Sequence, residues 1–172
     1  MNLDKELTSP RSMIQTLAVV DWIGQDPDRF GRLVKAYLGA NSRTTQNAAY
    51  FMMKAFDAHP QLVTPHLGQL IENLKTDPPV AIRRNTIRML QSQEIPEEYH
   101  GELAERCFKY LQDHKEAIAV KAFSMTVVSN LTDIYPDLKN ELKIVIKDLM
   151  QNGSPGIKSR GRKVLRHLES IK

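Results

Sequence analysis

The chain has few cysteine and aromatic residues, which several classes of protein require. Of its 172 residues one is cysteine, and aromatic residues make up 6%. A single cysteine excludes a disulfide framework and any cysteine-rich metal site. Sparse aromatics argue against an all-β fold, which favours aromatic and β-branched side chains.

Long apolar runs and targeting signals are also lacking. No run approaches the roughly 18 residues that a membrane span needs. A secretory leader would begin with basic residues, whereas Asp4 and Glu6 stand near this N-terminus. We therefore expect a protein of the reduced cytoplasm that does not enter a membrane.

What is present indicates an ordinary globular chain. Apolar residues make up 41% and charged residues 26%, with a formal net charge of +4. A chain of this length buries a sizeable core, and we expect one domain over residues 1–172, with residues 1–9 flexible. The positive charge favours an acidic partner.

Proline positions and apolar spacing predict helices. Four prolines follow a residue that commonly caps a helix, at Ser9-Pro10, Asp26-Pro27, Thr64-Pro65 and Ser154-Pro155. A capping side chain before proline is typical of a helix start, where the missing N–H has no partner to lose. Between these sites apolar residues recur every three or four positions, which is the stripe of an amphipathic helix. The chain is predicted to be all-α, with about nine helices.

One sequence pattern recurs along the chain. The pattern opens four predicted helices. It consists of an apolar residue, then a basic or polar one, a small residue three positions later and an apolar residue four positions beyond that. The copies begin at Thr45, Ile82, Val120 and Ile157, with a fainter copy at Ser9. Successive full copies lie 37, 38 and 37 residues apart. A period this regular indicates stacked helical hairpins.

The two best copies identify a family resemblance. Leu70–Leu90 reads LIENLKTDPPVAIRRNTIRML and Tyr110–Met125 reads YLQDHKEAIAVKAFSM, and both resemble the HEAT repeat. The resemblance implies a right-handed α-α superhelix of about four and a half helix pairs. Outer helices are expected at 27–39, 65–75, 96–111 and 136–150, inner helices at 42–58, 79–92, 115–131 and 155–170, and an opening helix near 10–24.

AVKAFSM, IYPDLKNEL and KSRGRKVLRHLESIK are also similar to a group of small bacterial HEAT-like proteins, some of which carry the name adenylosuccinate lyase. That enzyme's S-S-x-M-P-x-K-x-N signature loop is missing here, so the lyase activity is not implied.

Charge is distributed unevenly between the two sets of helices. The predicted inner helices carry twelve Lys and Arg against three Asp and Glu, whereas the outer helices balance nine against nine. In HEAT proteins the basic residue after the first apolar position packs toward the Asp of the preceding turn. The resemblance therefore gives Arg83, Lys121 and Lys158 a structural role opposite Asp77, Asp113 and Asn152.

The remaining cations define a candidate site. Helical steps from the third pattern position place twelve residues on an exposed inner face: Asn47, Phe51, Lys54, Arg84, Arg88, Gln91, Ala122, Thr126, Ser129, Ser159, Lys163 and Arg166. Its cations Lys54, Arg84, Arg88, Lys163 and Arg166 are predicted to form a basic groove. Solvated helix faces that keep the protein soluble are the alternative interpretation. A phosphate backbone or an acidic peptide would suit such a groove.

No arrangement of residues indicates catalysis. The five histidines lack metal-ligand spacing, Cys107 lies on an apolar stripe, and no cofactor motif occurs. Asp21 and Trp22 resemble residues that HEAT-like glycosylases of alkylated DNA bases use, although Trp22 also suits a core or end-cap position. We expect a non-catalytic interaction module that binds a protein or acidic partner and takes no cofactor or metal. Nucleic-acid binding through the same groove is the alternative, and a DNA glycosylase is a distant one.

Overall fold

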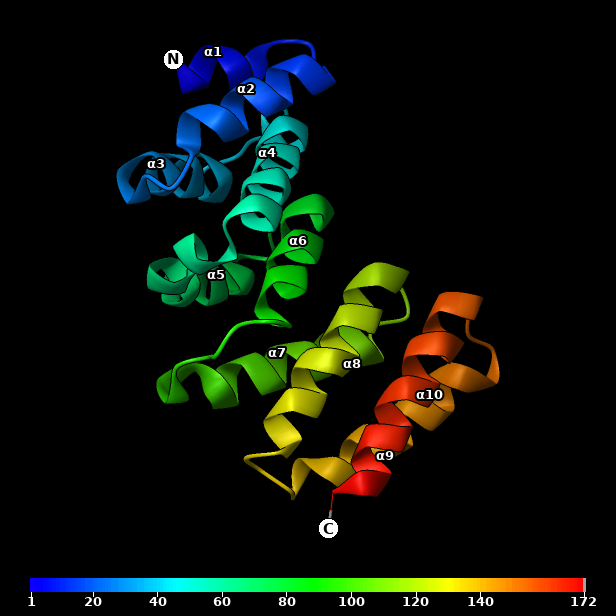
Figure 1. Cartoon of the computed structure of the whole chain (residues 1–172). Helices are drawn as coiled ribbons and strands as arrows, with labels where there is room; N and C mark the ends of the chain where they lie inside the picture. The colour runs from blue at the N-terminus through cyan, green and yellow to red at the C-terminus, as the bar shows by residue number, and fades with distance from the viewer. Residues whose placement is uncertain (172) are drawn as a thin grey trace. The chain divides into compact units, whose positions relative to one another are not determined.

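The computed structural model describes residues 1–171, and all regular elements in that range are helical (Figure 1). The α-helices are α1 (Leu3–Thr8), α2 (Met13–Ile23), α3 (Pro27–Leu38), α4 (Thr45–Ala58), α5 (Leu67–Asn73), α6 (Val80–Leu90), α7 (His100–Gln112), α8 (Ile118–Thr132), α9 (Leu138–Gln151) and α10 (Pro155–Ser170). The predicted all-α class is confirmed.

Two of the four predicted helix starts are confirmed. Asp26 caps α3 by accepting hydrogen bonds from the backbone N–H groups of Asp28 and Arg29, and the Ser154 hydroxyl caps α10. The Ser9-Pro10 prediction is wrong, because Ser9 ends α1 and Ser12 caps α2.

Thr64-Pro65 is also a wrong start, because Thr64 lies inside a 3₁₀ helix over Pro60–His66. The predicted outer helix 65–75 consists of this segment's end, α5, and a second 3₁₀ turn over Leu74–Thr76. A third 3₁₀ turn, Glu97–Tyr99, precedes α7. Proline lacks a backbone N–H, so short 3₁₀ turns are common where prolines interrupt the α-helical bonding pattern.

The first helix, α1, was not predicted. Asn2 accepts a hydrogen bond from the backbone N–H of Lys5, and the side chains of Leu3 and Leu7 are buried. Residues 3–8 thus have a defined helical conformation, while the flexibility expected of residues 1–9 stays a prediction.

Contacts within the chain divide it into two compact units: unit 1 is Met1–Asn85, and unit 2 begins at Thr86. The prediction of one domain over residues 1–172 stays a prediction.

Unit 1 is built around α4, which packs against α1, α2, α3 and the Pro60–His66 segment (Figure 1). Phe30, Tyr37 and Phe51 are fully buried in its core. Polar side chains also join helices here. The Tyr37 hydroxyl donates to the carbonyl of Ile82 at 2.6 Å, which fixes α3 to the first turn of α6.

Unit 2 is built around α8, which packs against α7, α9 and α10, and α8 and α10 run side by side (Figure 1). Gly161 on α10 allows a close approach, because a Cβ at that position would lie 2.5 Å from the Met150 sulfur and 3.1 Å from the Ile146 side chain. Close packing between helices depends on such small residues.

The recurrent small residues are buried in every full copy. Ala49, Thr86, Ser124 and Gly161 all lie below 9% exposure. The leading residues Thr45, Ile82, Val120 and Ile157 are buried as well. The 37-residue period therefore marks positions that are buried in α4, α6, α8 and α10.

Candidate functional site

The five predicted site residues differ in exposure. In unit 1, Lys54 on α4 and Arg84 on α6 are exposed. In unit 2, Lys163 and Arg166 on α10 are exposed, whereas Arg88 is half-buried. Four of the five cations are thus accessible within their own units.

Several positions predicted to face the groove are buried, and for these the prediction is wrong. Asn47 and Phe51 on α4 are 9% and 0% exposed, and Ala122 and Ser129 on α8 are 8% and 4% exposed. The reason is that α4 contacts three α-helices and a 3₁₀ helix, and α8 contacts three α-helices, so that the same pattern position meets a neighbour there. The pattern gives the period but not the number of neighbours.

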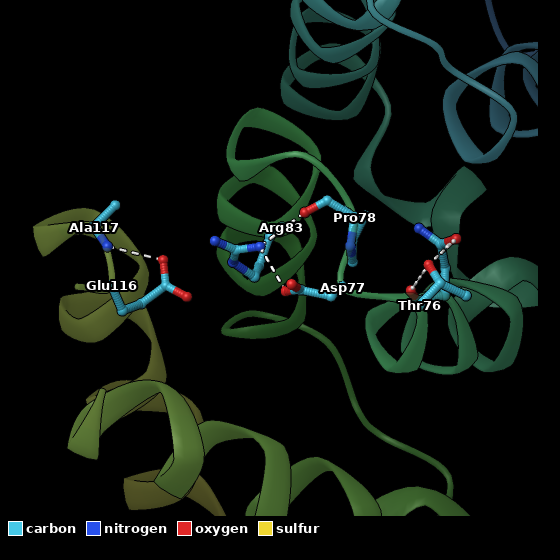
Figure 2. A network of polar contacts seen from close by, with 7 residues as sticks. Thr76, Asp77, Pro78, Arg83, Glu116 and Ala117 are labelled. Atoms are coloured by element: carbon cyan, nitrogen blue, oxygen red, sulfur yellow. Dashed lines mark hydrogen bonds and ion pairs between the residues drawn. The ribbon is translucent and has the colours of Figure 1, made fainter. Parts of the chain in front are cut away.

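The predicted pairing of Arg83 with Asp77 is confirmed (Figure 2). The Arg83 Nη1 atom lies 3.0 Å from a carboxylate oxygen of Asp77 and donates to the carbonyl of Pro78 at 2.8 Å. Asp77 has a left-handed backbone, with φ of 51°. Asp tolerates this conformation better than most residues, and the pair holds the turn that leads into α6.

The other two pairs of the predicted ladder do not form. Lys121 is 9% exposed, and among the described residues it makes no ion pair with Asp113. The Asp113 carboxylate instead accepts from the backbone N–H of Lys115. Glu116 accepts from the backbone N–H of Ala117 (Figure 2). In this turn the acidic side chains satisfy backbone donors before α8. Asn152 lacks a carboxylate and so cannot form an ion pair with Lys158. No hydrogen bond joins the side chains of these two residues among residues 1–171.

A cationic cluster surrounds Tyr50 in unit 1. The Arg11 guanidinium lies 4.8 Å from the centre of the Tyr50 ring, and the Lys54 ammonium lies 5.8 Å from it. Arg11 and Arg84 both line a pocket of about 100 Å³, together with Gln46 and Tyr50. We call Arg11, Gln46, Tyr50, Lys54 and Arg84 the Tyr50 cluster.

Two consecutive hydrogen bonds through Asn85 hold Arg84 in this cluster. The Asn85 amide donates to the carbonyl of Ala49 on α4 at 2.8 Å, and the Asn85 amide oxygen accepts from Arg84 Nε at 3.2 Å. Because Asn85 is 4% exposed and held by α4, the Nε atom of Arg84 has a defined position although the residue as a whole is exposed.

The cluster lacks a counter-charge. None of Arg11, Lys54 and Arg84 forms an ion pair with a carboxylate among the described residues. Elsewhere in unit 1, Arg29 pairs with Asp26 and Lys75 with Glu72. Arg11 and Lys54 share the Tyr50 ring, and Arg84 lines the same pocket as Arg11. These like charges repel one another, and an anionic group would relieve the repulsion.

In unit 2 the cations of α10 divide into two kinds. Lys163 and Arg166 are exposed and make no ion pair among the described residues. Arg160 is structural, because its Nη1 atom donates to the Gln91 side chain at 2.6 Å and to the Thr126 hydroxyl at 2.7 Å, and its guanidinium lies 5.7 Å from the Phe123 ring centre.

Trp22 is held by two arginines of the next helix. The guanidinium groups of Arg29 and Arg32 lie 5.4 Å and 5.2 Å from its ring centre, and Arg29 also donates to its backbone carbonyl at 2.6 Å. The ring is half-buried, while the adjacent Asp21 is exposed. These contacts give Trp22 a packing role between α2 and α3.

The buried histidine and cysteine of α7 are satisfied within the fold. The Ile95 carbonyl accepts from His100 Nε2 at 2.7 Å, so Nδ1 is the acceptor for the Tyr135 hydroxyl at 2.9 Å. Cys107 is fully buried, and burial raises the pKa of its thiol to about 12. Within residues 1–171 no three His, Cys, Asp or Glu residues are grouped to hold a metal ion.

Sequence reasoning missed Arg11, although a signal for it exists. The fainter copy begins at Ser9, so Arg11 occupies its third pattern position, and Arg84 occupies the same position two copies later. The rule that selected Arg84 would have selected Arg11 had it been extended to the weakest copy. No comparable pattern points to Tyr50 or Gln46, because their role depends on how α4 packs.

Comparison with protein families identifies the class of this chain. A sequence profile of the HEAT repeat domain matches residues 3–168. The chain belongs to the HEAT repeat family, and such a domain indicates a module of the protein-interaction scaffold kind. Searches of curated proteins and of solved structures give no match. In the described part of the chain, no helix has both the length and the apolar character to span a membrane.

Proposed function

We propose that this chain is a non-catalytic interaction module that binds an acidic segment of a protein partner through cations of its inner helices. Lys54 and Arg84 supply the charge in unit 1, and Arg88, Lys163 and Arg166 supply it in unit 2. The observation that carries the proposal is the Tyr50 cluster, whose three cations have no carboxylate partner in the described structure. Cationic side chains fixed before binding lose less entropy when a partner docks.

Capture from a native lysate at moderate salt tests this proposal. The wild-type chain should retain one protein that K54Q/R84Q and K163Q/R166Q lose. K35Q/K147Q removes two exposed cations outside these surfaces, one on α3 and one on α9, and should retain it. Equal retention by all four proteins would disprove the assignment of these residues.

Nucleic-acid binding is the second candidate, favoured by the excess of twelve cations over three acids in the predicted inner helices. Binding to phosphates releases counterions, so affinity for DNA or RNA should fall steeply with salt. Fluorescence anisotropy with labelled duplex and single-stranded probes at low and moderate salt decides between the candidates. Binding that is tight at low salt, weakens steeply at moderate salt and is lost in K54Q/R84Q would favour nucleic acid over an acidic protein segment.

A further inference from the structure

The pocket of the Tyr50 cluster is large enough for a small anionic group. Its volume is about 100 Å³, whereas a water molecule takes about 30 Å³ of liquid. The pocket therefore has room for a single phosphoryl or carboxylate group. Its lining includes polar residues, among them Arg11, Gln46 and Arg84, and the apolar residues Ala49 and Met53.

The charge of the pocket suits a dianion better than a monoanion. Two guanidinium groups line the space, and the Lys54 ammonium shares the Tyr50 ring with one of them. No carboxylate pairs with these three groups among residues 1–171. A phosphate monoester carries between one and a half and two negative charges near neutral pH, about twice that of a carboxylate.

The pocket is also lined by residues that can donate hydrogen bonds. Because Arg84 donates to Asn85 through its Nε atom, the two terminal nitrogens of that guanidinium remain to donate to a ligand. Arg11 is oriented by the Tyr50 ring, and the Gln46 amide adds a neutral donor. Planar forks of this kind bind phosphate through paired hydrogen bonds, and clusters of arginine recognise phosphorylated segments.

We infer that the Tyr50 cluster binds a phosphate monoester carried by the protein partner, so that phosphorylation of the partner strengthens binding. The inference rests on the proposed function, since it specifies one group of the acidic segment. Arg11 and Arg84 clamp the phosphoryl oxygens, and Lys54 supplies the third positive charge.

Nuclear magnetic resonance of the full chain tests the pocket with inorganic phosphate alone. The Nε–Hε signal of Arg84 should shift on titration, and R11Q and R84Q should each raise the dissociation constant at least fivefold. R84K keeps the charge but loses the fork, so it should bind between wild type and R84Q. K35Q removes an exposed lysine of α3 and should match the wild type. Equal affinity in R84Q and wild type would overturn the inference.

Peptides then identify the source of the group. A phosphoserine peptide of otherwise neutral sequence should bind at least tenfold more tightly than the same peptide with glutamate, and its unmodified form should not bind. Equal affinity for the phosphoserine and glutamate peptides would overturn the preference for phosphate. Tighter binding of a single-stranded RNA of matched charge, lost in R84Q, would overturn the choice of a protein partner.

The two proposals can fail separately. If a lysate partner is lost in K54Q/R84Q while phosphate binds wild type and R84Q alike, the interaction module stands and the phosphate pocket is wrong. If phosphate binding depends on Arg11 and Arg84 but all variants retain the same proteins, the pocket stands and the proposed function is wrong.

Discussion

Units 1 and 2 repeat the same sequence pattern but hold their helices together differently. In unit 1 side-chain amides and a hydroxyl reach backbone carbonyls of other elements: Asn47 to Leu7 and Ser9, Asn85 to Ala49, and Tyr37 to Ile82. In unit 2 the helices approach closely at Gly161, and Arg160 spans α8 and α10. Unit 1 thus relies on buried polar anchors, and one of them also positions Arg84.

Each unit contains its own spectroscopic or chemical reporter. Trp22, the single tryptophan, lies in unit 1, and Cys107, the single cysteine, lies in unit 2. The raised thiol pKa and full burial make Cys107 unreactive until unit 2 opens. Tryptophan fluorescence and thiol labelling therefore follow the two units separately in the same sample, and the predictions below use both.

The largest loss of stability is expected for Phe51→Ala in unit 1. Phe51 is fully buried, so truncation should leave a cavity and reduce the free energy of unfolding by about 3–5 kcal/mol. Denaturant unfolding followed by Trp22 fluorescence measures it. A loss below about 1 kcal/mol would mean that Phe51 faces solvent, as the sequence pattern predicted.

Gly161→Leu should have the next largest effect, in unit 2. The new side chain would overlap Met150 and Ile146, and overpacking of this kind costs about 1–3 kcal/mol. Faster labelling of Cys107 would report the loss. Gly101→Leu is the matched control, because a Cβ there meets no atom within 4 Å. Equal labelling rates in both variants would show that close helix approach does not stabilise unit 2.

Asn47→Ala tests the polar anchors. The Asn47 amide donates at 2.9 Å to the carbonyls of both Leu7 and Ser9, and their loss should destabilise unit 1 by about 1–2 kcal/mol. Asn130→Ala in unit 2 removes a similar bond, from an exposed amide to the Gln91 carbonyl, where water replaces the lost partner. Unfolding is followed by Trp22 fluorescence for unit 1 and by Cys107 labelling for unit 2. The loss in the free energy of unfolding should be smaller for Asn130→Ala than for Asn47→Ala, and the reverse order would contradict the comparison of the two units.

The smallest effect concerns pH in unit 1. Partial burial lowers the pKa of His66 below its ordinary value of 6.5, because desolvation disfavours the charged ring. The unfolded chain then binds a proton first, so the stability that neutral His66 confers is complete above pH 6.5 and is lost as the pH falls below it. The denaturant concentration at the unfolding midpoint, followed by Trp22 fluorescence, should decrease as the pH is lowered from 7 to 5. The decrease should be smaller in His66→Gln. His114→Gln, which removes an exposed histidine of unit 2, should leave that slope unchanged.

The helices were predictable because their signals are local. Apolar spacing and the caps at Asp26 and Ser154 depend on neighbours in the chain, and they placed α3 and α10 within a residue or two of their observed bounds. Thr64-Pro65 carried the same local signal and failed, since the prolines at 60 and 65 together favour a 3₁₀ segment.

The candidate site was only half predictable. Lys54 and Arg84 follow from the repeat, but the pattern placed Phe51 on the same face, and it is buried. Arg11 and Lys54 both lie over the Tyr50 ring because α4 packs against α2. The sequence of one helix does not encode this packing. Which face a middle helix buries depends on how many helices surround it.

Arg160 has a consequence for how the electrostatics of this protein are measured. Its guanidinium is already committed to Gln91, Ala122, Thr126 and the Phe123 ring. A polyanion that docks on α10 would therefore displace fewer counterions than the formal valence of that helix suggests. The slope of log affinity against log salt should fall short of the count of basic residues by about one contact.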